Sequence, residues 1–75
     1  MDERFKNYGK VSIRVIEECS ELTRAICKAE RFGYNNHHPD HPDLFNWMDI
    51  QSEIADVRRV IDEFEKSMQF KIGKS

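Results

Sequence analysis

The sequence predicts an all-α fold: an antiparallel helical hairpin that oligomerises into a four-helix-type bundle. Two stretches of the 75-residue chain repeat apolar residues at alternating steps of four and three, the pattern of helices that pack lengthwise. A short segment with one glycine and two prolines separates them. With 39% apolar and 35% charged residues, the composition suits one small helical domain spanning residues 1–75.

The first helix is expected over about residues 10–32. Its apolar positions form the first half of a predicted seam, which consists of Val15, Cys19, Leu22, Ile26 and Ala29. Asn7 and Ser12 are candidate N-caps, because their side chains accept hydrogen bonds from free backbone N–H groups. Gly33 can take the left-handed conformation that ends a helix, so the helix should stop close to Phe32.

The second helix is expected over about residues 44–70, after a His- and Pro-rich connection at 33–43. The two prolines favour an irregular connection. Asp43 and Asn46 are both plausible positions for the start of the helix. The second half of the predicted seam consists of Ile50, Ile54, Val57, Ile61, Phe64 and Met68.

Four acids each lie one residue before a seam position, about 100° around the helix from it. These acids are Glu18, Glu21, Glu53 and Asp56. Equivalent flanks of the two helices meet in an antiparallel hairpin, so the four carboxylates should converge. Clustered carboxylates repel one another unless a proton or a cation lies among them. A hard divalent ion, Mg²⁺ with Mn²⁺ as a substitute, suits such a set of oxygen ligands.

The acids also form two ordered motifs, EExxE over residues 17–21 and ExxD over residues 53–56. With the residues around them, these motifs resemble the MazG-like, all-α nucleoside triphosphate pyrophosphohydrolases, particularly small phage-type members. The resemblance covers about residues 12–65. It implies Mg²⁺-dependent cleavage of an NTP or dNTP between the α and β phosphates, which releases a nucleoside monophosphate and pyrophosphate.

The resemblance also implies roles for individual side chains. The metal ligands would be Glu18, Glu21, Glu53 and Asp56. The catalytic carboxylates would be Glu17, Glu18 and Glu21, with Glu17 orienting the attacking water or a second metal. Lys28 and Arg31 would bind the phosphates, with Arg24 as a weaker candidate, although basic residues late in a helix also favour its dipole.

Several further residues are candidates for contacts with the nucleoside. Trp47 and Phe32 could stack on a nucleobase, but in so short a chain packing is the commoner use of such residues. Asn35, Asn36 and Asn46 could bind a base or sugar, although turns and caps explain them equally well.

The C-terminal part of the chain departs from the family pattern. Many members continue past the ExxD helix into another helix with basic residues, whereas residues 66–75 are all that follows here. Lys71, Lys74 or a neighbouring subunit would then complete the triphosphate pocket. The alternative is a non-catalytic helical interaction module that keeps the acids and binds a protein partner.

Charge and hydropathy exclude other classes of function. A net charge of −2 without a basic stripe argues against nucleic-acid and anionic-membrane binding. No apolar run approaches membrane-spanning length, and we expect a cytoplasmic protein. A single hairpin has only one internal face, so a homodimer or homotetramer is expected.

Cysteine and histidine offer less favoured sites. Cys19 and Cys27 lie about 12 Å apart along one helix, too far for a disulfide, and are expected to be small buried residues of the seam. A transition-metal site in the connection would use histidines and aspartates that lack regular helical spacing. They are His37, His38, His41, Asp40 and Asp43.

Overall fold

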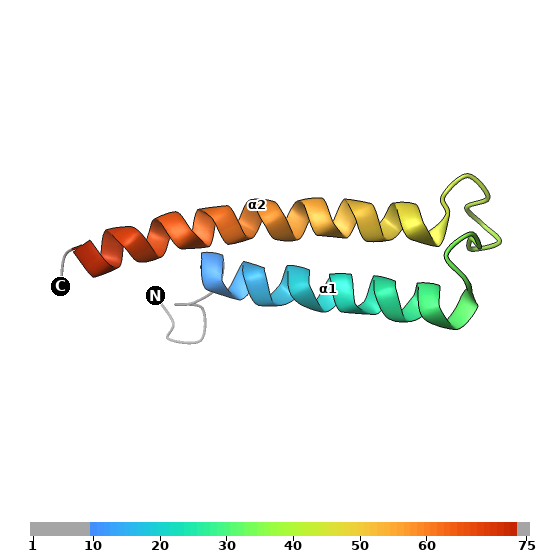
Figure 1. Cartoon of the computed structure of the whole chain (residues 1–75), viewed down its shortest axis with the longest axis horizontal. Helices are drawn as coiled ribbons and strands as arrows, with labels where there is room; N and C mark the ends of the chain where they lie inside the picture. Colours follow the sequence, from blue (N-terminus) through green and yellow to red (C-terminus); the bar gives the residue numbers. More distant parts are fainter. Residues whose placement is uncertain (1–9, 74–75) are drawn as a thin grey trace, which may run out of the picture.

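The structure is a computed structural model that describes residues 10–73, with side chains described for residues 10–69. Helix α1 spans Val11–Phe32 and helix α2 spans Asn46–Gly73. The two helices lie side by side and run in opposite directions (Figure 1). Within the described range the only β pairing is an isolated bridge between His37 and Phe45. The predicted all-α hairpin is therefore confirmed.

Helix α1 begins without a side-chain cap. Lys10 occupies the N-cap position and makes no capping hydrogen bond, so Ser12 is not the cap, and Asn7 lies outside the described residues. At the other end the N–H of Gly33 donates to Ala29 O at 2.7 Å. Gly33 has φ 103° and ψ 139°, which is a positive φ outside the left-handed helical region. Glycine adopts it without the penalty that a side chain would bring.

Two backbone hydrogen bonds join the connection to the first residues of α2. The N–H of Asn46 donates to Asn36 O at 2.8 Å, and the N–H of Trp47 donates to Tyr34 O at 3.1 Å. These bonds satisfy two of the free N–H groups of the first turn of α2, so Asp43 is not needed as a cap. Helix α2 accordingly begins at Asn46, the later of the two expected starts, and continues past residue 70.

Ion pairs between the helices keep a constant register. Arg14 Nη1 lies 3.3 Å from Glu63 Oε2, and Lys28 Nζ lies 3.2 Å from Asp49 Oδ2. Both pairs are partly exposed, so each contributes at most about 1 kcal/mol. Moving from one pair to the other advances fourteen residues on α1 and retreats fourteen on α2. The acidic residues between the pairs are therefore held opposite one another.

Small residues form the centre of the contact between the helices. The buried apolar side chains of the described chain are Ala25, Ala29, Val57 and Val60. Ala25 and Val60 were not in the predicted seam. The two alanines present only methyl groups to α2, which allows the helix backbones to approach closely.

The predicted seam is confirmed only in part, because Ala29 and Val57 are buried and five other members are half-buried. Four of its members are exposed rather than buried, and we call this set the outer seam: Cys19, Ile26, Ile61 and Met68. The contact face extends to the acids, and Glu18, Glu53 and Asp56 are half-buried in it. The acids precede the seam positions on both helices and meet between them. The outer seam therefore lies about 100° around each helix from these acids, outside the contact between the helices.

Hydropathy gives no membrane-spanning element in the part of the chain that the structure describes, because neither helix combines the required length with a sufficiently apolar window.

Candidate metal centre

Three carboxylates from two helices meet in the middle of the hairpin. Glu18 of α1 and Glu53 and Asp56 of α2 each offer one oxygen atom, and these oxygens all lie within 4.8 Å of one another. Glu53 and Asp56 are three residues apart, which places them on one face of α2. Within residues 10–69 this is the one group of three or more acidic, histidine or cysteine side chains with such spacing.

Glu53 is the least satisfied member of this cluster. Its Oε2 atom is fully buried and has no hydrogen-bond partner among the described residues. Burial raises the pKa of Glu53 above the ordinary glutamate value, and the negative charges of Glu21, Asp56, Glu18 and Asp49 raise it further. Burial and the neighbouring acids therefore both disfavour the ionised form of Glu53.

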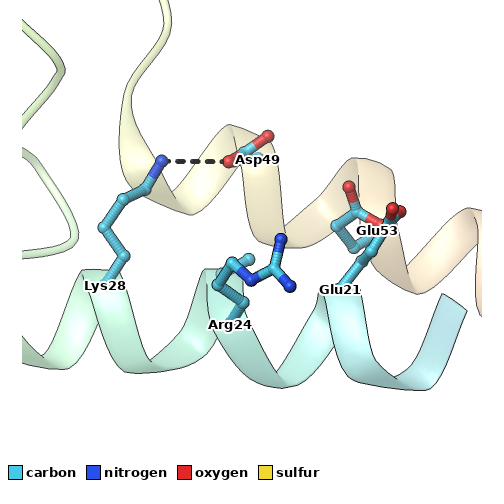
Figure 2. Close-up of a pocket in the computed structure, with 6 residues that line it drawn as sticks. Glu21, Arg24, Lys28, Asp49 and Glu53 are labelled. Carbon is cyan, nitrogen blue, oxygen red and sulfur yellow. Dashed lines mark hydrogen bonds and ion pairs between the residues drawn. The ribbon is translucent and has the colours of Figure 1, made fainter. Parts of the chain in front are cut away.

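Glu21 lies beside the cluster rather than in it. It is exposed, and it lines a cavity of about 290 Å³ together with Glu53, Asp49, Arg24 and Lys28 (Figure 2). Its charge contributes to the raised pKa of Glu53. Glu21 and Glu53 thus face one space, into which cationic side chains project from the same helix as Glu21.

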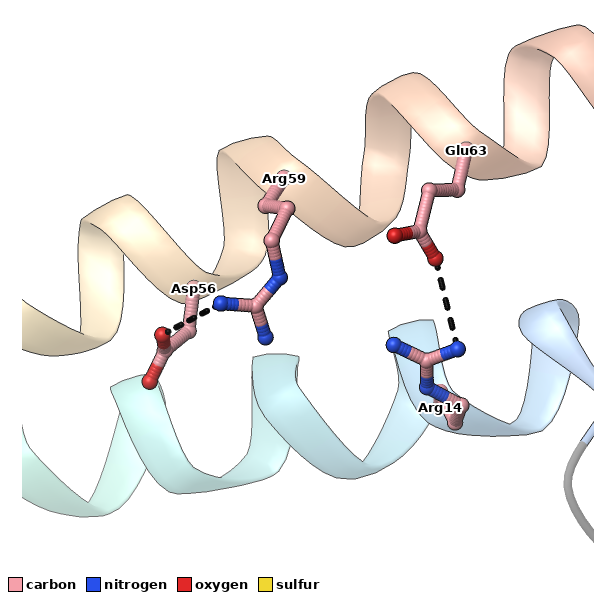
Figure 3. A network of polar contacts seen from close by, with 4 residues as sticks. All are labelled: Arg14, Asp56, Arg59 and Glu63. Atoms are coloured by element: carbon pink, nitrogen blue, oxygen red, sulfur yellow. Dashed lines mark hydrogen bonds and ion pairs between the residues drawn. The ribbon is translucent and has the colours of Figure 1, made fainter.

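The basic side chains around the cluster differ in whether they already form an ion pair with a carboxylate. Lys28 is bound to Asp49, and Asp56 accepts a hydrogen bond from Arg59 Nη1 at 3.3 Å (Figures 2 and 3). Arg24 lines the cavity and belongs to none of the ion pairs among the described residues. Among those residues, Arg24 is therefore the unpaired cation of the cavity lining.

Three predicted site residues lie away from the cluster. Glu17 is exposed on α1 and is not part of the three-carboxylate group. Arg31 is exposed in the last turn of α1, and Trp47 is 38% exposed at the start of α2. Neither Arg31 nor Trp47 lines the cavity beside Glu21.

Sequence reasoning did not single out Asp49 or Arg59. Asp49 comes four residues before Glu53, and Arg59 comes three residues after Asp56. Side chains at these spacings are neighbours on a helix, so the same periodicity that identified the ExxD motif could have found both.

The other sites considered are not assembled among the described residues. The histidines of the connection do not form a group of three ligands with the neighbouring aspartates, although His38 Nδ1 lies 3.7 Å from Asp40 Oδ2. Cys19 and Cys27 are free and exposed, so the expectation that they are buried is wrong. The side chain of Lys71 and the whole of Lys74 lie outside the described range.

The cluster fits a divalent cation by the chemistry of its donors. It supplies three carboxylates on a rigid pair of helices, and one oxygen is buried without a partner. Hard cations such as Mg²⁺ and Mn²⁺ prefer oxygen ligands, and Mg²⁺ commonly keeps several waters beside one or two carboxylates. A bound cation would also remove the repulsion that raises the pKa of Glu53.

Comparisons with protein-family models, with curated proteins and with solved structures find no match to this chain.

Proposed function

We propose that the chain is a Mg²⁺-dependent nucleoside triphosphate pyrophosphohydrolase of the MazG-like type. The observation that carries the proposal is the meeting of Glu18, Glu53 and Asp56 around a buried, unpartnered carboxylate oxygen. An acidic cluster alone is compatible with many sites. Here it belongs to two ordered motifs, EExxE and ExxD, and it adjoins a cavity lined by basic side chains.

In this proposal Glu18, Glu53 and Asp56 hold the ion. A Mg²⁺ ion would supply charge neutralisation of the triphosphate and a water molecule with a lowered pKa. Mn²⁺, which has the same preference for oxygen, is expected to substitute.

The basic side chains of the cavity would bind the phosphates. Arg24 lines the cavity and lies between Lys28 and Glu21 along α1 (Figure 2). Its planar guanidinium can donate two parallel hydrogen bonds to a phosphate. Lys28 would add a second positive charge, although it must share its ammonium group with Asp49, 3.2 Å away. We therefore prefer Arg24 to Arg31 as the arginine that contacts the substrate.

The carboxylate of Glu21 is the best-placed acceptor for the proton of the attacking water. Hydrolysis adds one water molecule across the bond between the α-phosphorus and the bridging oxygen, and pyrophosphate leaves. The water loses a proton, and Glu21 is the exposed acid that faces the cavity beside Glu53. Glu17, exposed one residue before Glu18, would act from outside by orienting water or a second ion.

We further propose that two hairpins, or four, associate through the outer seam. Only four apolar side chains are buried in the described chain, a small core for a protein of this length. Cys19 and Ile26 are seven residues apart on α1, and Ile61 and Met68 are seven apart on α2. Each pair forms a stripe along its helix, and two copies that join their stripes form a four-helix bundle.

The exposed apolar side chains also favour the alternative, a non-catalytic interaction module. In that case the outer seam would bind a different protein, and the acids would be remnants of a site. Catalysis separates the two proposals, because a module without activity leaves every nucleotide intact.

The test is a pyrophosphate-release assay across a panel of NTPs and dNTPs, with Mg²⁺ or Mn²⁺ and with products identified by mass. We expect monophosphate and pyrophosphate from the wild type, and a loss of at least about 100-fold in Asp56→Asn. Asp62→Asn is the matched control, since Asp62 is an exposed aspartate of α2 that pairs with Lys66 at 3.0 Å, away from the site. Folded wild-type protein that leaves the whole panel intact would favour the interaction module.

A further inference from the structure

A second cavity lies at the end of the hairpin where the chain reverses. It has a volume of about 360 Å³, in the range of small-molecule sites. The end of α1, the connection and the first residue of α2 enclose it. The lining residues used below are Lys28, Phe32, Asn36 and Asn46.

The two cavities are neighbours along α1 and share one lining side chain. Lys28 lines both the cavity beside Glu21 and the cavity beside Phe32. Along the helix axis Lys28 is about 10 Å from Glu21 and about 6 Å from Phe32. A nucleotide whose phosphates lie beside Arg24 and Lys28 would therefore extend its sugar and base toward Phe32.

We propose that this second cavity is the nucleoside subsite, and that it favours a base with an amino group in place of a carbonyl oxygen at the C4 position of cytosine or the C6 position of adenine. This inference rests on the proposed function, because it assumes that the phosphates occupy the cavity beside Glu21.

Phe32 supplies a surface on which a base can stack. It is 61% exposed although it is aromatic, and it borders the cavity rather than the helix contact. Stacking of a base on an aromatic side chain contributes about 1–3 kcal/mol in proteins that bind single-stranded nucleic acids, and it does not depend on the identity of the base. Phe32 would thus hold the base without selecting among bases.

Asn46 supplies the selection. It is 4% exposed, the one buried polar residue among the described side chains, and its Nδ2 donates to Gly33 O at 2.8 Å. This bond fixes the amide orientation, since a flipped amide would set two oxygens against each other. Its Oδ1 receives no hydrogen bond from a described residue, and it is not among the fully buried unpaired atoms. Because Asn46 lines the cavity, a ligand bound there would be the partner for this acceptor.

The neighbouring Asn36 does not compete for that role. Its Nδ2 donates to Phe32 O at 3.0 Å and its Oδ1 accepts from the N–H of His37 at 2.8 Å. Both ends of its amide are engaged in holding the connection. The free acceptor of Asn46 would instead receive the amino hydrogen of cytosine or adenine, whereas uracil or hypoxanthine would present a carbonyl oxygen to it.

The experiment compares pairs of substrates in which an amino group is exchanged for a carbonyl oxygen and the adjacent ring nitrogen gains a hydrogen, dCTP with dUTP and dATP with dITP, for hydrolysis by the full chain. We expect kcat/KM to be at least about tenfold higher for the amino member of each pair. Phe32→Ala should raise KM for dCTP about tenfold with little change in kcat. Leu44→Ala is the control, because Leu44 is also exposed near the connection, at 48%, and does not line this cavity. Equal use of both members, together with a KM that Phe32→Ala leaves unchanged, would overturn the subsite.

A binding measurement separates failure of the subsite from failure of the reaction. Amide chemical shifts of the labelled wild type are followed during titration with dCMP and dUMP. Larger changes at Phe32 and Asn46 with dCMP than with dUMP would support the subsite. If no triphosphate is hydrolysed while these changes occur, the proposed reaction is overturned and the subsite stands. Hydrolysis without such changes would leave the reaction standing and overturn the subsite.

Discussion

Arg59 Nη1 lies 3.3 Å from Asp56 Oδ1, so one of the three clustered carboxylates already has a positive partner from its own helix (Figure 3). The pair is partly exposed, with side-chain accessibilities of 59% and 36%. Arg59 therefore compensates only part of the negative charge, and it competes with any cation for the same carboxylate.

This competition predicts that Arg59→Gln raises the affinity of the site for Mg²⁺. The increase should be modest, about two- to fivefold, because the ion pair is partly exposed to solvent. Isothermal titration calorimetry of the wild type and the variant measures it. Arg58→Gln is the control, since Arg58 is exposed and belongs to none of the described ion pairs. A lower affinity in Arg59→Gln would mean that Arg59 positions Asp56 for the ion.

The raised pKa of Glu53 predicts a pH-dependent cost in the metal-free protein. A carboxyl group whose pKa is higher in the folded state favours folding when it is protonated. This contribution is fully present below the unfolded pKa of about 4.3 and is lost as the pH rises through the folded pKa. Above that range the ionised Glu53 destabilises the fold.

Glu53→Gln should therefore melt at a higher temperature than the wild type at neutral pH in EDTA, and the difference should shrink as the pH falls from about 7 to about 4. Circular dichroism melts across this range measure the difference. Glu65→Gln, which removes an exposed acid of the same helix, should show no such trend. A difference that is constant with pH would show that the ionisation of Glu53 is not responsible.

Divalent cations should stabilise the wild type by mass action. A ligand that binds only the folded state at about 100 times its Kd adds about 2.7 kcal/mol to the free energy of unfolding. Mg²⁺ and Mn²⁺ should raise the melting temperature of the wild type and of Asp62→Asn, with a smaller effect on Asp56→Asn. Equal shifts in all three proteins would indicate general salt screening.

The outer seam predicts assembly through one side of the hairpin. Ile61→Glu would place a charge in the proposed interface and should weaken association at least about 100-fold. Sedimentation velocity over a concentration series measures the change. Leu44→Glu, at an exposed apolar position near the connection, should keep the wild-type assembly state. Unchanged association in Ile61→Glu would exclude the outer seam as the interface.

The reactivity of the two cysteines tests the same proposed interface in the wild-type protein. Both thiols are exposed on the single hairpin. Cys19 belongs to the outer seam, whereas Cys27 lies one residue beyond Ile26, about 100° around the helix. A thiol reagent should modify Cys27 rapidly and Cys19 slowly in the assembled wild type. Equal rates for both thiols would contradict coverage of the outer seam.

The sequence predicted the helices well because their boundaries depend on local chemistry. Gly33 ends α1 through a positive φ, as a glycine at that position indicates. The sequence left the start of α2 open between Leu44 and Asn46, because the bonds of Asn46 and Trp47 to Asn36 and Tyr34 depend on how the connection folds back. Backbone hydrogen bonds of this kind produce no periodic pattern in the sequence.

Which members of the apolar seam are buried could not be read from the apolar pattern alone. Spacing identifies every apolar stripe, but it does not say whether the stripe meets the second helix or another copy. Ala25 contributes little hydrophobicity and was left out of the seam, yet its small size allows the close helix contact. The prediction that four acids converge holds for Glu18, Glu53 and Asp56, whereas Glu21 lies beside them.

The most direct test of the central claim is to locate a bound Mn²⁺ by its paramagnetic broadening of amide signals in the labelled protein. The account predicts that substoichiometric Mn²⁺ first broadens the amides of Glu18, Glu53 and Asp56, that Mg²⁺ restores them, and that Glu53→Gln greatly weakens the effect. Broadening centred on the histidines of the connection, or spread evenly over all exposed acids, would contradict a metal centre between the helices.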